Sequence, residues 1–250
     1  MGYLPEGDAL SVGENPKAMY HMTGVSSISR EGYYFTLNGK ASVRELFVAS
    51  PARFFVTNAA LAAVTAEICG ADERSIAEGI AHMRGVPGRM ERVELPKEAP
   101  FCAYLDYAHT PDALEKLLQS LRGMRKGRGR VLLLFGCGGE RDRGKRRQMG
   151  RIATQLADLS VVTADNSRGE PTEEIIKDIL KGIDKEKPYC VIPDRREAIT
   201  HLVQSARRDD ILVLAGKGHE TYEIDATGKH PFDEREILLR AYESAWARKK

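Results

Sequence analysis

The second part of the chain alternates short apolar runs with segments whose apolar residues recur at helical spacing. The apolar runs, which predict buried strands, are 101–105, 130–136, 159–164, 189–192 and 211–215. Helices are predicted after Thr110, around Met149, after Thr172, after Asp194 and from about 233 to 246. Thr110 is a favourable N-cap, and Pro111 suits the first helical turn. This alternation, with right-handed crossovers, predicts an α/β fold: a mostly parallel sheet with helices on both faces.

The first ninety residues follow a different pattern. The predicted elements there are strands at 32–37 and 43–48 and helices at about 58–68 and 72–83. Asn38-Gly39, between the two strands, is a dipeptide typical of tight hairpin turns. The segment 85–89, GVPGR, contains two glycines and a proline, so it predicts a domain boundary or hinge.

Composition narrows the class of protein. At 250 residues, with 42% hydrophobic and 30% charged positions, the chain is long enough for one large domain or two small ones. A net charge of +2 predicts neither a nucleic-acid partner nor a membrane partner. The four cysteines fit neither zinc spacing nor a small disulfide framework, so we expect reduced thiols and no metal site. No apolar run approaches the roughly 20 residues that span a membrane, and no signal-peptide pattern is present, so we expect a cytoplasmic protein.

Polar segments follow four of the predicted strands. They are 106–111, 136–146, 165–168 and 216–220. Ligands bind at the carboxyl ends of parallel strands, so four such loops at one sheet edge predict a binding site. Each loop also has a structural explanation: Asp106 could cap a turn, His109 could lie at the surface, and Asp165-Asn166 could form an Asx turn. Lys217, between two glycines, is harder to explain in this way because a simple turn needs no charge.

The segment 131–146, VLLLFGCGGERDRGKR, carries the strongest single signal. Gly139, Gly144 and Lys145 match the start of a nucleotide P-loop, but Arg146 stands where a Ser or Thr should hold magnesium, so we interpret the match as accidental. The cations of this loop are Arg141, Arg143, Lys145 and Arg146. Basic residues at a helix start oppose the helix dipole, which favours a bound anion over a merely solvated helix end.

Five segments together resemble the Mur ligases, most closely the branch of that family that adds a diamino acid. They are VPGRMERV (86–93), DYAHTPDALE (106–115), FGCGGERDRGKR (135–146), TADNSR (163–168) and AGKGHE (215–220). The resemblance implies that 94–250 is the family's C-terminal domain, a Rossmann-like fold that clamps amino acid and nucleotide. It implies that 1–93 is the last part of the central ATPase domain, strands plus two helices without the P-loop.

Mur ligases couple ATP hydrolysis to amide-bond formation in peptidoglycan precursor synthesis. The substrates implied here are ATP, UDP-N-acetylmuramoyl-L-alanyl-D-glutamate and meso-diaminopimelate, with the dipeptide carboxylate activated as an acyl phosphate that the amine attacks. By this resemblance the diamino acid contacts Arg141, Asp165, Asn166, Arg168, Gly216 and Glu220. The nucleotide contacts Asn58, Arg89, Asp106 and Tyr107, and catalytic roles fall on Lys145 and His109. In the family an arginine at the position of Arg168 marks enzymes that use meso-diaminopimelate, because a guanidinium binds its distal carboxylate and repels the ammonium end of lysine.

The chain also departs from the family pattern. It contains no GTNGKT-type P-loop, no N-terminal sugar domain and no counterpart of the lysine that the family carbamylates to help hold Mg²⁺. ATP and Mg²⁺ therefore belong to a complete enzyme that includes the missing N-terminal half, and the isolated chain is expected to be inactive. The resemblance leaves three origins open for the chain: a cloned fragment, an incomplete gene product or the partner of a separately encoded half. Ser167 replaces a usual proline, and Phe55 and Thr57 replace an asparagine and a tyrosine near the adenine side. A partial central sheet also predicts loose packing of residues 1–50 around an unpaired edge.

Three other interpretations compete with this one. A Rossmann dehydrogenase is disfavoured because no strand is followed by GxGxxG with a later acidic residue. Folylpolyglutamate synthetase shares the broad architecture, but the DNSR and GKGHE loops fit it poorly. A non-catalytic module that binds a diamino acid or a cell-wall peptide stays open, because the pocket residues are present and the ATPase core is not.

Overall fold

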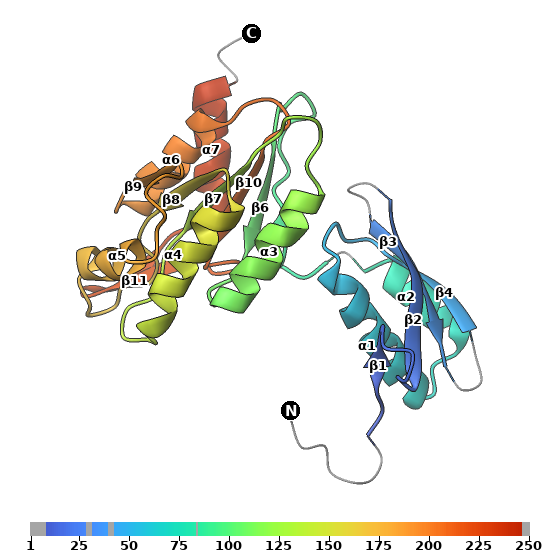
Figure 1. Ribbon diagram of the computed structural model, residues 1–250. Helices are drawn as coiled ribbons and strands as arrows, with labels where there is room; N and C mark the ends of the chain where they lie inside the picture. The colour runs from blue at the N-terminus through green and yellow to red at the C-terminus, as the bar shows by residue number, and fades with distance from the viewer. Residues whose placement is uncertain (1–8, 29–31, 40–42, 84, 247–250) are drawn as a thin grey trace. The chain divides into compact units, whose positions relative to one another are not determined.

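The computed structural model describes residues 9–28, 32–39, 43–83 and 85–246. The chain divides into two compact units, residues 1–85 (unit 1) and 86–250 (unit 2). Residues 86–93, expected to belong with the first domain, lie in unit 2. There β5 (Glu91–Arg92) pairs with β6 (Cys102–Asp106), and Val93 is buried in the unit 2 core. Helices α1 to α7 and the strands are labelled in Figure 1.

Unit 1 is a four-stranded sheet covered by two helices. Its elements are β1 (Val12–Gly13), β2 (Tyr20–Ile28), β3 (Gly32–Asn38), β4 (Val43–Val48), α1 (Phe54–Ile68) and α2 (Glu73–Ala81). The strands lie in the order β1-β2-β3-β4, with β2, β3 and β4 antiparallel. Asn38 pairs with Val43, as the predicted hairpin requires, although residues 40–42 of its turn lie outside the described residues.

Two expectations for unit 1 are corrected. The described part of residues 1–50 is not loosely packed, because alternate residues of β3 and β4, such as Phe35 and Leu46, are buried. Helix α1 begins at Phe54, four residues before the predicted start at Asn58. The reason is that Phe55 and Val56 continue the buried stripe formed by the helix's alanines.

Unit 2 is a mostly parallel sheet with helices on both faces, as the strand–helix alternation predicted. Its strands are β6, β7 (Val131–Phe135), β8 (Leu159–Val162), β9 (Tyr189–Val191) and β10 (Ile211–Ala215), with β5 antiparallel at one edge. Its helices are α3 (Pro111–Gly123), α4 (Gly144–Leu156), α5 (Thr172–Leu180), α6 (Arg195–Ser205) and α7 (Glu234–Trp246). The Thr110 side chain accepts a hydrogen bond from the Ala113 N–H, which confirms the predicted cap of α3. A hairpin of β11 (Tyr222–Asp225) and β12 (Gly228–Pro231) lies between β10 and α7 in the sequence.

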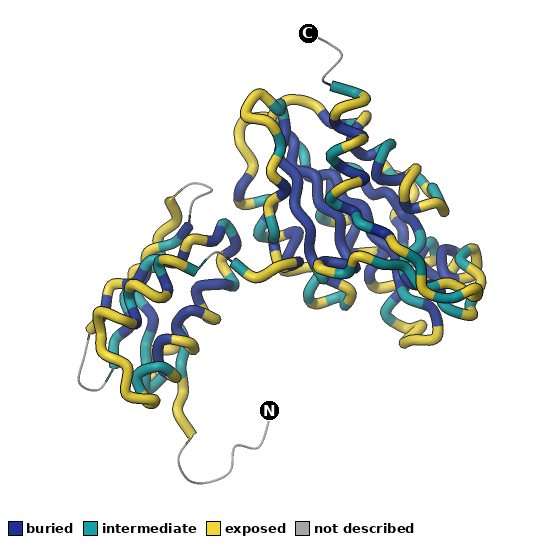
Figure 2. Tube along the Cα trace, turned by 180° about the vertical axis from the view of Figure 1, so that it is seen from behind, coloured by how far each residue is buried: buried dark blue, intermediate teal, exposed yellow. Residues whose placement is uncertain are grey.

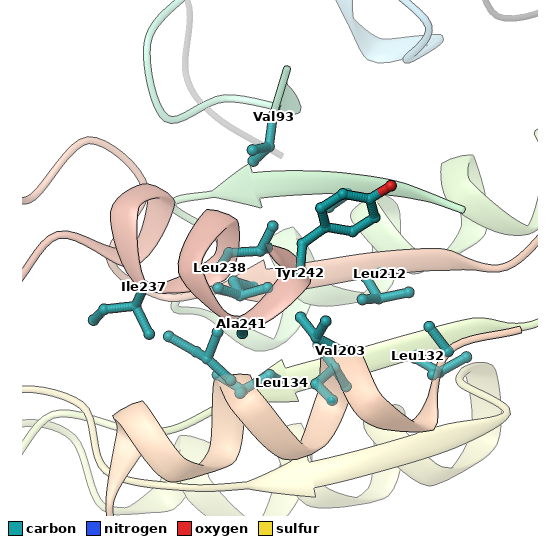
Figure 3. Packing of buried hydrophobic residues seen from close by; sticks show 14 of the residues in the cluster. Val93, Leu132, Leu134, Val203, Leu212, Ile237, Leu238, Ala241 and Tyr242 are labelled. Atoms are coloured by element: carbon teal, nitrogen blue, oxygen red, sulfur yellow. The ribbon is translucent and has the colours of Figure 1, made fainter. Parts of the chain in front are cut away.

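The sheet separates the helices into two layers. Figure 1 shows α3 and α4 on one side and α6 and α7 on the other. The core on the α6 and α7 side contains alternate residues of each strand, such as Leu132 and Leu134 of β7 (Figure 3). Figure 2 shows the central strands as the most buried part of this unit.

Strand order places the predicted loops together. The last strand in sequence, β10, lies between β6 and β7, giving the order β5-β6-β10-β7-β8-β9. The strands also end level with one another, because Ala215 is in register with both Asp106 and Phe135, and Phe135 with Val162. The loops after β6, β7, β8 and β10 therefore leave the sheet at one edge.

Candidate functional site

A cavity of about 360 Å³ opens at this edge of unit 2. Its lining comes from the four loops that follow β6, β7, β8 and β10. The lining residues are Tyr107, His109, Thr110, Gly138, Arg141, Asp142, Lys145, Asp165, Asn166, Arg168, Gly216 and Glu220. All six residues predicted to contact a diamino acid are in this set, together with Lys145 and His109. The structure therefore brings these side chains to one place, while their roles stay predictions.

The loop after β8 holds Arg168 in a constrained conformation. Arg168 has a φ of +54°, in the left-handed region, and its N–H donates to the carbonyl oxygen of Ile224. Its Nη1 donates to the carbonyl oxygens of Gly139 and Asn166, both at 3.0 Å. Among the described residues, Nε and Nη2 have no acceptor. One edge of the guanidinium is therefore anchored, and its remaining donors can serve a ligand.

Asn166 connects the loop after β8 to the loop after β10. Its Nδ2 donates to Glu220 at 2.8 Å, and its Oδ1 accepts from the Nζ of Lys217 at 2.8 Å and from the Ile224 N–H at 3.0 Å. Lys217 is fully buried and does not line the cavity; it also donates to the Tyr222 carbonyl oxygen. Burial lowers the pKa of Lys217. The Lys217 ammonium group therefore binds acceptors inside the protein, which gives its charge the structural explanation that a simple turn lacked.

The glycines of the loop after β7 serve close packing against the loop after β8. A Cβ at Gly139 would lie 1.9 Å from the carbonyl oxygen of Ser167, and a Cβ at Gly136 would lie 2.5 Å from that of Thr163. The Gly139 N–H also donates to the Asn166 carbonyl oxygen at 2.9 Å. Packing between the two loops thus explains these glycines, in agreement with the interpretation of the P-loop match as accidental.

Two of the four cations of this loop are neutralised by the protein itself. Arg146 is fully buried, and its guanidinium binds both Glu170 oxygens at 2.7 Å and Asp178 at 3.1 Å. Arg143 binds Asp178 as well, at 2.9 Å. These carboxylates supply the negative charge at the start of α4 for which we had inferred a bound anion. Only Arg141 and Lys145 of the four line the cavity.

The predicted catalytic residues are joined through the backbone. Nζ of Lys145, in the first turn of α4, donates to the carbonyl oxygen of His109 at 2.8 Å. The Nδ1 of His109 lies 2.9 Å from the Tyr107 carbonyl oxygen. Arg141 is exposed on the cavity wall, so its guanidinium is accessible to an anion.

The residues predicted to bind nucleotide are only partly at the cavity. Tyr107 lines it, and the guanidinium of Arg89 lies 4.7 Å from the centre of the Tyr107 ring. Asp106 is buried outside the lining, where its two oxygens accept hydrogen bonds from the N–H groups of Met90 and Ala108, both at 2.7 Å. Burial raises the pKa of Asp106, although these two bonds act in the opposite direction. Asn58 is an exposed residue of α1 in unit 1 and is not among the lining residues.

Several residues near the site carried no usable signal in the sequence. Thr110 suggested only a helix cap, and Asp142 was given no role of its own. Arg195 and Glu234, whose buried pair lies behind the loops after β8 and β10, begin helices far apart in the sequence. The spacing of residues along the sequence could not have predicted that Arg195 and Glu234 form an ion pair.

A metal ion has no evident place among the described residues. No group of three or more His, Cys, Asp or Glu side chains there could hold one. The described cavity carboxylates therefore do not form a cage that would hold a metal ion by themselves. Over the same described ranges, no helix is long and apolar enough to cross a membrane.

The parallel α/β sheet, with a loop cavity at the carboxyl ends of its strands, has the architecture of the α/β ligand-binding class. Residues 88–218 match the family model described as Mur ligase, glutamate ligase domain, so the chain belongs to the Mur ligase family. It is 42% identical over 211 residues to the UDP-N-acetylmuramoyl-L-alanyl-D-glutamate–2,6-diaminopimelate ligase of Caldanaerobacter subterraneus subsp. tengcongensis, covering 84% of this chain and 43% of that protein. It is 51% identical over 182 residues to the ligase of the same name from Gloeobacter violaceus, covering 72% of this chain and 37% of that protein.

A solved structure of a ligase of that name agrees with these similarities. It superimposes with a TM-score of 0.63 at 33% identity, covering 92% of this chain and 46% of that one. The chain thus spans less than half the length of the relatives that it matches.

Proposed function

We propose that this chain forms the diamino-acid-binding part of an ATP-dependent ligase that joins meso-diaminopimelate to UDP-N-acetylmuramoyl-L-alanyl-D-glutamate. One observation carries the proposal: the cavity is lined by two guanidinium groups, those of Arg141 and Arg168, and by the carboxylates of Asp142, Asp165 and Glu220. meso-Diaminopimelate carries two carboxylates and two ammonium groups, so each of its charges has a counterpart. The names of the relatives support the same substrate.

Arg168 supplies the selectivity in this proposal. Its Nη1 is held by the carbonyl oxygens of Gly139 and Asn166, so the remaining donors have a defined direction and can bind a carboxylate with little loss of side-chain entropy. L-Lysine would place an ammonium group against the same guanidinium. That repulsion favours meso-diaminopimelate.

The remaining cavity residues orient the amine. Glu220, itself fixed by Asn166, accepts hydrogen bonds from one ammonium group, and Arg141 pairs with the α-carboxylate. ATP, when bound by the complete enzyme, supplies the phosphoryl group that activates the dipeptide carboxylate. The ammonium group gives a proton to solvent, and the free amine attacks the acyl carbon. The C–N bond forms, the acyl C–O bond breaks so that phosphate leaves with its electron pair, and a second proton of the amine goes to solvent. Lys145, in the first turn of α4, stabilises the negative charge of the phosphate group.

A calorimetric titration tests the binding role. We expect the chain to bind meso-diaminopimelate more tightly than L-lysine. Arg168→Ala should weaken the binding of meso-diaminopimelate roughly 10- to 100-fold, since hydrogen bonds to charged groups contribute about 1.5–3 kcal/mol. Arg147→Ala, which removes an exposed arginine of α4 outside the cavity, is the matched control and should bind like the unchanged chain. Absence of binding, or a preference for meso-diaminopimelate that survives in Arg168→Ala, would contradict the proposal.

We further propose that the chain by itself binds the amino acid without turnover. The sequence has no P-loop motif, and among the described residues no metal-holding cluster is present. Incubation with ATP, Mg²⁺, the UDP-linked dipeptide and meso-diaminopimelate should therefore release no ADP above the level of a protein-free control. Steady ADP release by the purified chain would refute this.

A further inference from the structure

Behind the cavity, one buried arginine joins two of the loops that line it. Arg195 is the first residue of α6 and is 2% exposed. Its Nη1 donates to the carbonyl oxygen of Ala164 at 2.8 Å, and its Nη2 donates to that of Ala215 at 3.0 Å. Its Nε donates to Glu234, the first residue of α7, at 2.7 Å. Every nitrogen of the guanidinium is therefore used inside the protein.

The two carbonyl groups belong to strands that are not neighbours in the sheet. Ala215 ends β10, and Ala164 lies two residues beyond the end of β8; β7 separates the two strands. No β-ladder can set the distance between their loops directly. The Arg195 guanidinium bridges their backbones, because its planar fork reaches one carbonyl oxygen on each side; it does so in addition to the side-chain hydrogen bonds that Asn166 makes with Glu220 and Lys217.

The residues that follow these two carbonyl groups line the cavity on adjoining walls. Asp165 comes directly after Ala164, and Gly216 comes directly after Ala215. A Cβ at Gly216, whose φ is +121°, would lie 2.5 Å from an Asp165 carboxylate oxygen. The walls meet closely at this point, so a small change in the separation of the two carbonyls would move the cavity residues of both loops.

The arginine is not explained by stability alone. Glu234 is 2% exposed, its second carboxylate oxygen has no partner, and burial raises its pKa. Burying such a pair costs desolvation energy that an apolar pair of similar volume would avoid. An apolar pair, however, could not hold two carbonyl oxygens at a set distance. A positional role accounts for the choice of an ion pair.

We propose that Arg195, oriented by Glu234, is a positioning residue that sets the separation between the Asp165–Arg168 wall and the Gly216–Glu220 wall of the cavity. Its effect on the ligand rests on the proposed function. Its effect on the loops does not, because Arg195 contacts their backbone whether or not a ligand is bound.

The test compares Arg195→Lys with Arg130→Lys. Arg130 forms a similar arginine–carboxylate pair at the amino ends of β7 and β10, although its side chain is 26% exposed. It binds Asp210 at 2.6 Å and the Ser205 carbonyl oxygen at 2.9 Å, at the other end of these strands from the cavity loops. In both variants lysine keeps the positive charge but lacks the planar guanidinium group, so it cannot donate to several acceptors at fixed positions. By calorimetry we expect Arg195→Lys to weaken the binding of meso-diaminopimelate at least tenfold. Arg130→Lys should weaken this binding less than threefold, although it lowers the melting temperature by a comparable amount.

Hydrogen exchange gives a readout that needs no ligand. The N–H of Gly216 donates to the backbone carbonyl oxygen of Asp106, and the N–H of Gly139 to that of Asn166. At the other end of β10, the N–H of Ile211 donates to the backbone carbonyl oxygen of Arg130. We expect exchange at Gly216 and Gly139 to be at least tenfold faster in Arg195→Lys, and in Arg130→Lys the faster exchange should fall on Ile211.

The outcomes separate the two proposals. If the unchanged chain does not bind meso-diaminopimelate, the proposed function fails, and the exchange measurement still decides the role of Arg195. Unchanged exchange at Gly216 and Gly139 in Arg195→Lys overturns the inference, as does an equal loss of affinity in Arg130→Lys. If Arg195→Lys does not fold, Glu234→Gln, which keeps the shape of the side chain and removes its charge, should show the same changes at threefold or more.

Discussion

Replacing Arg146 by methionine removes a buried cation from the start of α4 while keeping most of the side-chain volume. Arg146 binds both oxygens of Glu170, one oxygen of Asp178 and the carbonyl oxygen of Gly138. The variant would leave Glu170 without its main partner. Asp178 would keep Arg143 and Lys181.

The expected loss can be estimated from Glu170. The hydrogen bonds from Arg146 are the largest cause that lowers the pKa of Glu170 from its ordinary 4.5 to about 2. That difference corresponds to at most about 3 kcal/mol, and we expect about 2 kcal/mol after screening by solvent, since the Glu170 side chain is 17% exposed. With the unpaired groups included, the free energy of unfolding at pH 7 should fall by roughly 2–4 kcal/mol.

The stabilisation that Glu170 contributes depends on pH in a direction that its lowered pKa determines. The pKa of Glu170 in the folded protein lies below the unfolded value, so its stabilisation is complete above about pH 4.5 and is lost as the pH falls toward 2. The difference between the unchanged chain and Arg146→Met should therefore be largest at pH 7 and shrink by about 2 kcal/mol toward pH 2. Urea unfolding followed by fluorescence of the single tryptophan, Trp246, which packs against Phe101 in unit 2, measures this at each pH.

Arg143→Met is the matched control. Arg143 binds the same Asp178, but its side chain is 64% exposed, so its removal should cost less than about 1 kcal/mol. Equal losses in the two variants would refute the reasoning. So would a loss in Arg146→Met that stays constant from pH 7 to pH 2.5.

Two further predictions follow from packing. Gly139→Ala adds a Cβ that would meet the Ser167 carbonyl oxygen, so it should destabilise unit 2 by about 1–3 kcal/mol and weaken the binding of meso-diaminopimelate in calorimetry. Gly123→Ala, whose Cβ would lie in open space at the end of α3, should leave both unchanged. Equal melting temperatures of the two variants would contradict this prediction. A thiol reagent at pH 8 should label exposed Cys69 first and leave Cys137 protected, since burial raises the pKa of Cys137 to about 12, and mass spectrometry that finds the two labelled together would disprove that order.

The sequence by itself determined the elements of unit 2 and the edge where its loops gather. Strand and helix signals are local: apolar runs between turns predicted β6, β7, β8 and β10, and Thr110 predicted the start of α3 through one side-chain hydrogen bond. The carboxyl edge followed because parallel strands all end on one side. The residues predicted to bind the diamino acid were assigned by the resemblance of whole loops, because their spacing alone would not have assigned them.

Only the tertiary structure decided what each charge in those loops does. Arg146 looked like an anion-binding cation in the sequence, and the charge of Lys217 had no local explanation. Both side chains are buried and bind the protein itself, because their acceptors come from residues distant in the chain. The insertion of β10 between β6 and β7 was likewise undetermined, since periodicity does not encode strand order. That order brings Ala215 within reach of Arg195, and with it the two walls of the cavity. A local pattern specifies which residues can form a strand, a cap or a loop, whereas long-range packing specifies which partner each charged side chain finds.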